Sequence, residues 1–197
     1  MKALINFLFE VGMLKKTPRT GYQFLGSGKE SVADHSFRTA IIGFMLSRQE
    51  PDADSYKTTL MCLFHDLHEA RTGDLNYVNK RYVQMDEEKA VNDLAEGLPF
   101  GEDIISLTHE FNRGESLEAR ISRDADQIDL IVGLKEQQDL GNRYARDWLK
   151  YALQRLQTEN AKKMAIEILN TDSTDWWFEK KREWWVNGPE AKLHVKN

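Results

Sequence analysis

The sequence predicts an all-α fold in a single domain, and three observations carry that prediction. Apolar residues recur every three to four positions through most of the chain, as they do on the buried face of a helix. No segment alternates apolar and polar residues with the two-residue period of a half-buried strand. The chain has only 4 prolines in 197 residues, so long helices are seldom interrupted.

Length and charge narrow the possible classes of function. A chain of 197 residues has the length of one domain, since domains run to about 100–200 residues. Its 27 Lys and Arg against 32 Asp and Glu give a net charge of −5, which argues against a nucleic-acid polymer as partner. Cys62 is the single cysteine, which excludes an internal disulfide and a Cys-rich metal site.

The N-terminal apolar segment is typical of an amphipathic helix. Asn6 and Glu10 interrupt it and no small-residue cleavage site follows, which argues against a signal peptide. No apolar stretch approaches the ~18 residues that a transmembrane helix needs. We therefore expect a soluble, cytoplasmic protein with no membrane partner.

Caps and apolar spacing predict the first helix boundaries. A first helix follows the apolar stripe over Leu4–Leu14, and an irregular segment that contains three glycines covers Thr17–Lys29. The second helix begins at Glu30, where Ser31 can cap it with Asp34 three residues further on.

The remaining helices are predicted in the same way. The third starts in Pro51–Asp54 and runs through Leu67 to Thr72-Gly73, where the glycine can take the left-handed conformation that ends a helix. Further stripes predict helices at about Tyr82–Glu96, Gly101–Phe111, Leu117–Leu140, Arg146–Thr158, Asn160–Leu169 and Trp176–Val186. The chain, 1–197, is then one domain with a core at about 4–140 and a C-terminal helical extension at about 146–186.

The tryptophan-rich C-terminal segment is interpreted as packing. Trp176-Trp177-Phe178 and Trp184-Trp185 recur at helical spacing, which places them on one face against the bundle or a second subunit. A cover over a substrate pocket is the alternative. Lys180-Lys181-Arg182-Glu183 is typical of a solvated helix surface.

The segment Phe64-His65-Asp66-Leu67-His68-Glu69 carries the main chemical pattern. Residues four apart share one face of a helix, so His65 and Glu69 would project into one space with Asp66 at its border. Imidazole and carboxylate together suit Mn²⁺, Co²⁺, Fe²⁺ or Zn²⁺. A hydrogen-bonded His–Asp pair is the other interpretation. The apolar flanks, and His35 placed similarly on the preceding helix, favour a buried metal site between helices.

Four strings of residues in chain order extend this pattern. They are Glu30-Ser31-Val32-Ala33-Asp34-His35-Ser36, His65-Asp66 with Glu69, Thr72-Gly73-Asp74-Leu75 and Ala125-Asp126, within about Leu4–Asp139. Together they resemble the HD-domain metal-dependent phosphohydrolases and are most similar to the 5′-deoxynucleotidase branch. The resemblance implies a helical bundle of the HD-domain type. It also implies removal of the 5′-phosphate from nucleoside or deoxynucleoside 5′-monophosphates by attack of a metal-activated water.

The resemblance also implies roles for single residues. Glu69 would be the general acid or base, and Asp74 would help to orient substrate and water. One divalent ion (Mn²⁺, Co²⁺, Mg²⁺, Fe²⁺ or Zn²⁺) would be ligated by His35, His65, Asp66 and Asp126.

The last of these ligands has an alternative. Asp124, Asp126 and Asp129 lie on one predicted helix, and helical periodicity does not choose among them. The similarity of Arg123-x-Ala125-Asp126 to the family's last motif favours Asp126, with Asp129 as the alternate.

Pro18-Arg19-Thr20-Gly21-Tyr22 also matches the family. The resemblance implies that Arg19 contacts the substrate phosphate, to which a guanidinium can donate two hydrogen bonds, and that Tyr22 lies near the sugar or base. Lys15 and Lys16 would make this a locally basic entrance for a small anion. A solvated surface arginine is the alternative.

Two other functions and a second metal site are also conceivable for this sequence. A phosphodiesterase or pyrophosphohydrolase acting on cyclic or polyphosphorylated nucleotides is the second enzymatic hypothesis. A non-catalytic nucleotide-binding module is disfavoured because the ligand set is complete. A second metal at His68 or His109 is disfavoured because the 5′-deoxynucleotidase branch does not require histidine there, and Cys62 is expected to be buried and inert. The resemblance and the aromatic C-terminal segment favour a homodimer.

Overall fold

The computed structural model describes residues 1–178 and 184–188, and within those ranges all regular structure is helical. The predicted all-α fold is confirmed. The elements are α1 (Lys2–Val11), η1 (Gly12–Lys15), α2 (Tyr22–Leu25), α3 (Val32–Ser47), α4 (Ser55–Phe64), α5 (Glu69–Thr72), η2 (Asn79–Arg81), α6 (Glu87–Ala95), α7 (Gly101–Arg113), α8 (Leu117–Asp139), α9 (Arg143–Leu153), α10 (Glu159–Asn170) and α11 (Trp184–Asn187). None of the described helices is long and apolar enough to cross a membrane.

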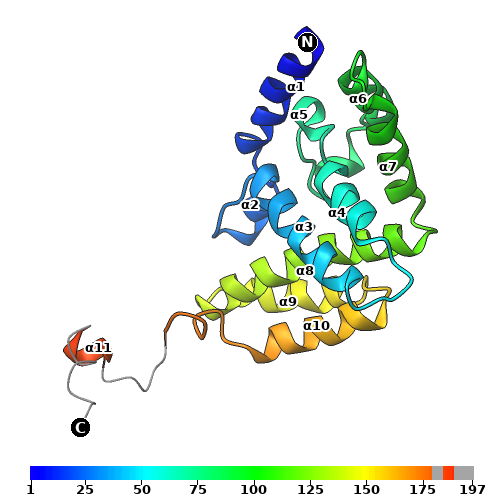
Figure 1. Ribbon diagram of the computed structural model, residues 1–197. Helices are drawn as coiled ribbons and strands as arrows, with labels where there is room; N and C mark the ends of the chain where they lie inside the picture. The colour runs from blue at the N-terminus through cyan, green and yellow to red at the C-terminus, as the bar shows by residue number, and fades with distance from the viewer. Residues whose placement is uncertain (179–183, 189–197) are drawn as a thin grey trace.

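Two apolar clusters hold the helices together. The larger one joins α3, α4, α8, α9 and α10, with Ile128 and Ile131 of α8 fully buried at its centre. The smaller one joins η1, the start of α3, α6 and α7 through residues such as Leu14 and Ile104. Figure 1 shows the corresponding division, with α1, α5, α6 and α7 above α8, α9 and α10. Helix α3 takes part in both clusters, so its first turns lie at their junction.

The start and the middle of α3 are fixed by short-range contacts. Ser31 and Asp34 form the expected capping box, in which each side chain accepts a hydrogen bond from the other's backbone N–H. Further along, a Cβ built on Gly43 would lie 2.5 Å from Cys62 Sγ, so α3 and α4 can pack this closely only with glycine there. Cys62 is fully buried and burial raises the pKa of its thiol to about 12, as expected of an inert core cysteine.

The predicted third helix is wrong in its second half, because α4 ends at Phe64. The backbone turns over His65–His68 before α5 begins at Glu69. Backbone N–H groups here reach back three residues, as from Glu69 to Asp66, and the His65 ring bonds the Cys62 carbonyl. His65 and Glu69 therefore do not share the face of one regular helix, although the turn keeps them in the same region.

Other predicted boundaries shift where capping residues lie. The helix expected from Tyr82 begins at Glu87, because Asp86 caps it by accepting from the Lys89 N–H. The helix expected at Arg146–Thr158 is Arg143–Leu153, capped by Asn142. The helix expected over Trp176–Val186 is not present at residues 176–178, and α11 covers only the end of its range. Its stretch 179–183, with the whole charged run, lies outside the described residues.

Asp124 links α8 to the last helices. It is fully buried, and its two carboxylate oxygens accept from the backbone N–H groups of Gln157 at 2.8 Å and Thr158 at 2.7 Å. Thr158 in turn caps α10. The side chain thus satisfies two N–H groups at the entry to α10, and it is the first of the three aspartates on α8 that spacing could not separate.

We expect the Asp124→Ala protein to be destabilised because two N–H donors lose their partner. An unpaired buried polar group costs about 1–3 kcal/mol, so the free energy of unfolding should fall by roughly 2–5 kcal/mol. Urea unfolding measures this change. Asp147→Ala is the matched control, since its exposed carboxylate forms a surface ion pair with Lys150. An equal loss in both variants would contradict the structural role of Asp124.

Candidate active site

Two histidines from different helices meet inside the bundle. His35 lies in the second turn of α3 and His65 directly after α4, and their ring centroids are 5.4 Å apart. His35 is fully buried and His65 is 4% exposed. Both Nε2 atoms are buried and make no hydrogen bond with any residue that the structure describes. A buried polar atom without a partner lowers the stability of the fold. This pair of nitrogen atoms is therefore suited to bind a ligand between the two rings.

Carboxylates face the same two nitrogen atoms. Asp66 Oδ2 lies 3.2 Å from His65 Nε2 and 3.5 Å from His35 Nε2, and Asp126 Oδ1 lies 3.3 Å from His35 Nε2. One donor atom each from His35, His65 and Asp126 falls within a span of 4.8 Å. Imidazole nitrogen and carboxylate oxygen are the donors that borderline divalent ions take in proteins, so these residues fit such an ion.

The other nitrogen of each ring is held by a hydrogen bond. His65 Nδ1 lies 2.8 Å from the Cys62 carbonyl oxygen, and His35 Nδ1 lies 2.6 Å from Asp129 Oδ2. A carbonyl or carboxylate beside Nδ1 favours a proton on that nitrogen and leaves the lone pair on Nε2. Both rings therefore turn Nε2, and not Nδ1, toward the space between them.

The three α8 aspartates have three different surroundings. Asp126 faces His35 Nε2, whereas Asp129 lies on the opposite edge of that ring and Asp124 bonds the entry to α10. Asp129 also accepts from Arg38 Nε, and the Arg38 guanidinium reaches two further carboxylates, Glu30 and Glu136, each at 3.1 Å. Asp129 is thus placed to orient His35, while Asp126 is placed among the candidate metal ligands.

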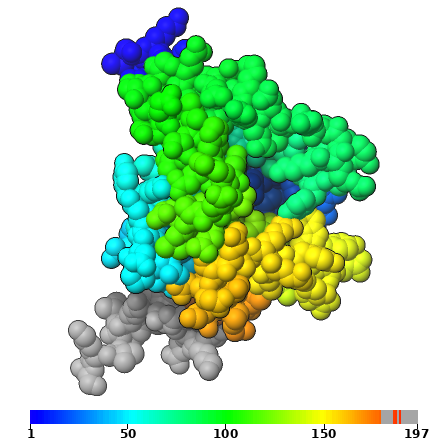
Figure 2. Space-filling view, turned by 90° about the vertical axis from the view of Figure 1, so that its right-hand side faces the viewer, coloured from blue at the N-terminus to red at the C-terminus, as the bar shows by residue number. Residues whose placement is uncertain are grey.

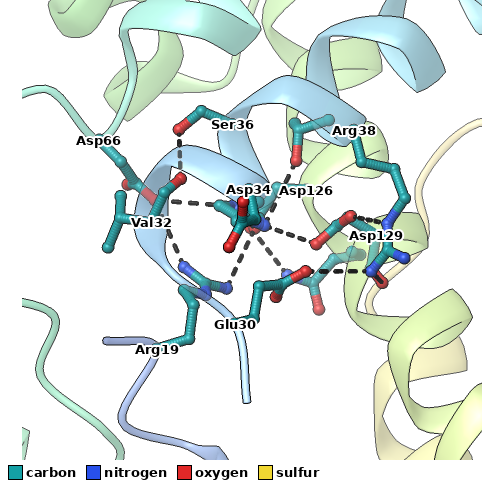
Figure 3. A network of polar contacts seen from close by, with 12 residues as sticks. Arg19, Glu30, Val32, Asp34, Ser36, Arg38, Asp66, Asp126 and Asp129 are labelled. Atoms are coloured by element: carbon teal, nitrogen blue, oxygen red, sulfur yellow. Dashed lines mark hydrogen bonds and ion pairs between the residues drawn. The ribbon is translucent and has the colours of Figure 1, made fainter. Parts of the chain in front are cut away.

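Arg19 lies beside the candidate metal ligands. Its Nη1 is 3.4 Å from Asp66 Oδ2 and its Nη2 is 4.0 Å from Asp126 Oδ1. Figure 3 shows the side chain reaching toward both aspartates, with Glu30 and Arg38 on the Asp129 side. Burial lowers the pKa of the guanidinium, but Asp66 and Asp126 outweigh it and hold that pKa above the ordinary value. Arg19 is a fixed cation that could meet a phosphate at this place.

Glu69 and Asp74 line the same region. Glu69 is 7% exposed and its Oε2 has no hydrogen-bond partner. Burial, followed by the charges of Asp66 and Asp74, raises the pKa of its carboxyl group, which keeps its proton to higher pH than an exposed glutamate. Asp74 Oδ2 accepts from the backbone N–H of Thr20, at 2.5 Å, and from its hydroxyl at 3.1 Å. Asp74 therefore holds the loop that carries Arg19.

Tyr22 packs against α8 and the Gly28 loop. Its hydroxyl oxygen would be 2.6 Å from a Cβ built on Gly133 of α8, and its ring would be 2.8 Å from one built on Gly28. Burial and the charge of Glu30 raise the pKa of its hydroxyl group. The structure therefore places Tyr22 beside the Glu30–Arg38 group, where it packs on α8.

Sequence reasoning assigned no role to several residues of this region, including Arg38. The signal for Arg38 was helical spacing, because it follows His35 by three residues, as the alternate ligand Asp129 follows Asp126. His68 is buried with no partner at Nδ1, but within the described residues neither it nor His109 belongs to a group of side chains that could hold an ion.

Comparison with known proteins gives a consistent picture. The family model of the HD domain matches residues 11–168. The chain is 31% identical over 149 residues to 5′-deoxynucleotidase HDDC2 of Bos taurus, covering 73% of this chain and 72% of that protein. It is 27% identical to 5′-deoxynucleotidase hdd1 of Schizosaccharomyces pombe, covering 68% and 72%. A solved structure of a conserved hypothetical protein from Pyrococcus furiosus has a TM-score of 0.73 at 28% identity, covering 85% and 99%.

The chain belongs to the HD domain family. The match to residues 11–168 extends beyond α8 and includes α9 and most of α10. An HD-domain phosphohydrolase from Listeria innocua has the same fold at 16% identity, with a TM-score of 0.68 over 96% of this chain.

Proposed function

We propose that this chain is a metal-dependent phosphohydrolase that removes the 5′-phosphate from nucleoside and deoxynucleoside 5′-monophosphates. The observation that carries the proposal is the pair of buried Nε2 atoms without hydrogen bonds, facing Asp66 and Asp126 with Arg19 alongside. The names of the curated relatives support a nucleotide monophosphate as substrate.

His35, His65, Asp66 and Asp126 would hold one divalent ion of the series Mn²⁺, Co²⁺, Mg²⁺, Fe²⁺ and Zn²⁺. Such an ion supplies Lewis-acid polarisation of the phosphoryl group and makes water more acidic. The residues around it then have distinct tasks.

Arg19 binds and orients the phosphate. Its guanidinium is already held in place by two carboxylates, so little side-chain entropy is lost when an anion arrives. Asp74 fixes the Arg19 loop through Thr20 and helps to orient substrate and water. Glu69 exchanges the proton, because its buried and unpartnered Oε2 can accept from water or donate to the leaving 5′ oxygen. Tyr22 packs on α8 beside Glu30 and Arg38, so we propose for it a role in holding the Arg19 loop against α8 instead of a contact with the sugar.

The decisive experiment measures phosphate release from a panel of ribo- and deoxynucleoside 5′-monophosphates. Protein stripped of metal is resupplied with each ion in turn, beside the Asp66→Ala variant. We expect release from these 5′-monophosphates only with metal, and none from the variant. Turnover of cyclic or polyphosphorylated nucleotides alone would overturn the monophosphatase proposal in favour of a phosphodiesterase or pyrophosphohydrolase.

We also propose that the protein is a cytoplasmic homodimer. The outer face of α3 exposes a row of apolar side chains at helical spacing: Phe37, Ile41, Phe44 and Met45. Such a contiguous row is typical of a surface that another protein covers. Light scattering after gel filtration should give twice the chain mass of 22.9 kDa, and a monomer at micromolar concentration would overturn this proposal.

A further inference from the structure

A bridge of side chains runs outward from Asp126 to the loop that follows α5. Gln127 Nε2 donates to Asp126 Oδ2 at 3.0 Å, and Gln127 Oε1 accepts from Arg155 Nη1 at 3.2 Å. The Arg155 guanidinium carbon then lies 5.0 Å from the centre of the Tyr77 ring. None of these three side chains has a role in the proposed chemistry, yet they connect a candidate metal ligand to the surface.

The two outer residues of this bridge come from two segments that flank a hollow in the molecular surface (Figure 2). Figure 2 shows the hollow between the teal-green segment after α5 and the yellow segment around the end of α9, with the blue N-terminal part of the chain visible at its floor. Tyr77 belongs to the first wall and Arg155 to the second. The loop on the first wall is held by Asn76, whose buried side chain accepts from the N–H groups of Val78 and Asn79.

The order of the side chains along the bridge indicates which end of a bound nucleotide would lie near its outer residues. A phosphate would lie at the inner end, where Arg19 contacts Asp66 and Asp126. Gln127 is the next group outward, and Arg155 and Tyr77 are the outermost. A nucleotide bound by its phosphate therefore points its nucleoside end toward Tyr77 and Arg155.

We propose that Tyr77 and Arg155 form the subsite for the base of the nucleotide. This inference rests on the proposed function and deepens it. The Tyr77 side chain is 65% exposed while Arg155 covers one side of its ring, so a flat aromatic surface remains free for stacking. The Arg155 guanidinium is itself planar and is fixed by Gln127, so it extends that surface.

The chemistry of such a subsite predicts broad acceptance of bases. Stacking uses the π face that every base possesses and does not read hydrogen bonds at its edge. The site should therefore bind purine and pyrimidine monophosphates and gain affinity from either. A substrate without a base should gain nothing from Tyr77 or Arg155.

The test compares nucleoside 5′-monophosphates with 2-deoxyribose 5-phosphate, which lacks the base. We expect Tyr77→Ala and Arg155→Met to raise KM for the nucleotides about tenfold, as loss of one base–aromatic contact does. Neither change should alter KM for deoxyribose 5-phosphate. Tyr77→Phe, which keeps the ring, should retain the normal KM for nucleotides.

A second guanidinium–aromatic pair provides the matched control. The Arg143 guanidinium carbon lies 4.8 Å from the Tyr144 ring centre at the start of α9, and Tyr144 is half exposed. Tyr144→Ala and Arg143→Met should leave every KM unchanged. An unchanged nucleotide KM in Tyr77→Ala, or an equal rise for deoxyribose 5-phosphate, would overturn the base subsite while leaving the phosphatase proposal intact. Wild-type protein that hydrolyses no nucleotide would overturn the proposed function itself.

Discussion

Replacing Asp126 with asparagine is expected to lower metal-dependent phosphate release by more than about 100-fold, because even changes behind a metal ligand cost about 10–100-fold. Asparagine keeps the shape of the side chain but removes the negative charge beside His35 Nε2 and Arg19. The loss should therefore be in metal affinity and activity, with the free energy of unfolding nearly unchanged.

Comparison with Asp129→Asn distinguishes a metal ligand from a residue that only orients a ligand. Asp129 contacts the far edge of the His35 ring and Arg38, so this change should weaken metal binding by about 10–100-fold without abolishing it. Metal content and activity, measured as the ion is titrated, distinguish the two variants. If excess metal restores Asp126→Asn fully but not Asp129→Asn, the two assignments are reversed.

Replacing Glu69 with glutamine is expected to lower kcat by about 10²–10⁴-fold, the range that a positioned acid or base contributes. Glutamine fills the same space but can neither take up nor release a proton at this site. Because Glu69 is not among the candidate ligands, metal content and KM should stay close to normal.

Single-turnover kinetics with a metal assay checks this prediction. Asp74→Asn is an informative comparison, since it loosens the Arg19 loop and should act mainly on KM. A Glu69→Gln protein that lacks metal would show that Glu69 acts as a ligand, and one with normal kcat would exclude it from proton transfer.

The fold class could be predicted from the sequence, and so could the residues that gather around His35. Apolar spacing predicted α3, α7 and α8 closely, since these are the three longest helices. It did not predict the turn at His65–His68, because the hydrogen bond from the His65 ring to the Cys62 carbonyl depends on tertiary structure that a local pattern does not contain.

The surroundings of the α8 aspartates could not be predicted for the same reason. Asp124 bonds Gln157 and Thr158, which lie more than thirty residues away in the sequence. Asp129 bonds His35 of α3, which lies 94 residues earlier in the chain. The three aspartates lie within two turns of α8, so helical spacing alone gives them no different roles. Only the residues that each one contacts in the folded chain distinguish them. Arg155 and Tyr77 also meet although they lie far apart in the sequence.

The hydrogen bonds of Asp124 have a consequence for the smallest unit that can fold. The predicted core ended at about residue 140, but Asp124 is fully buried and takes its partners from residues 157 and 158. A fragment ending after α8 would remove both partners of Asp124 and would expose to water the apolar side chains of α8 that α9 and α10 cover, close to Asp126. The last helices therefore form part of the scaffold that positions the candidate active site. A domain shortened to α1–α8 would lose its stability and this site together.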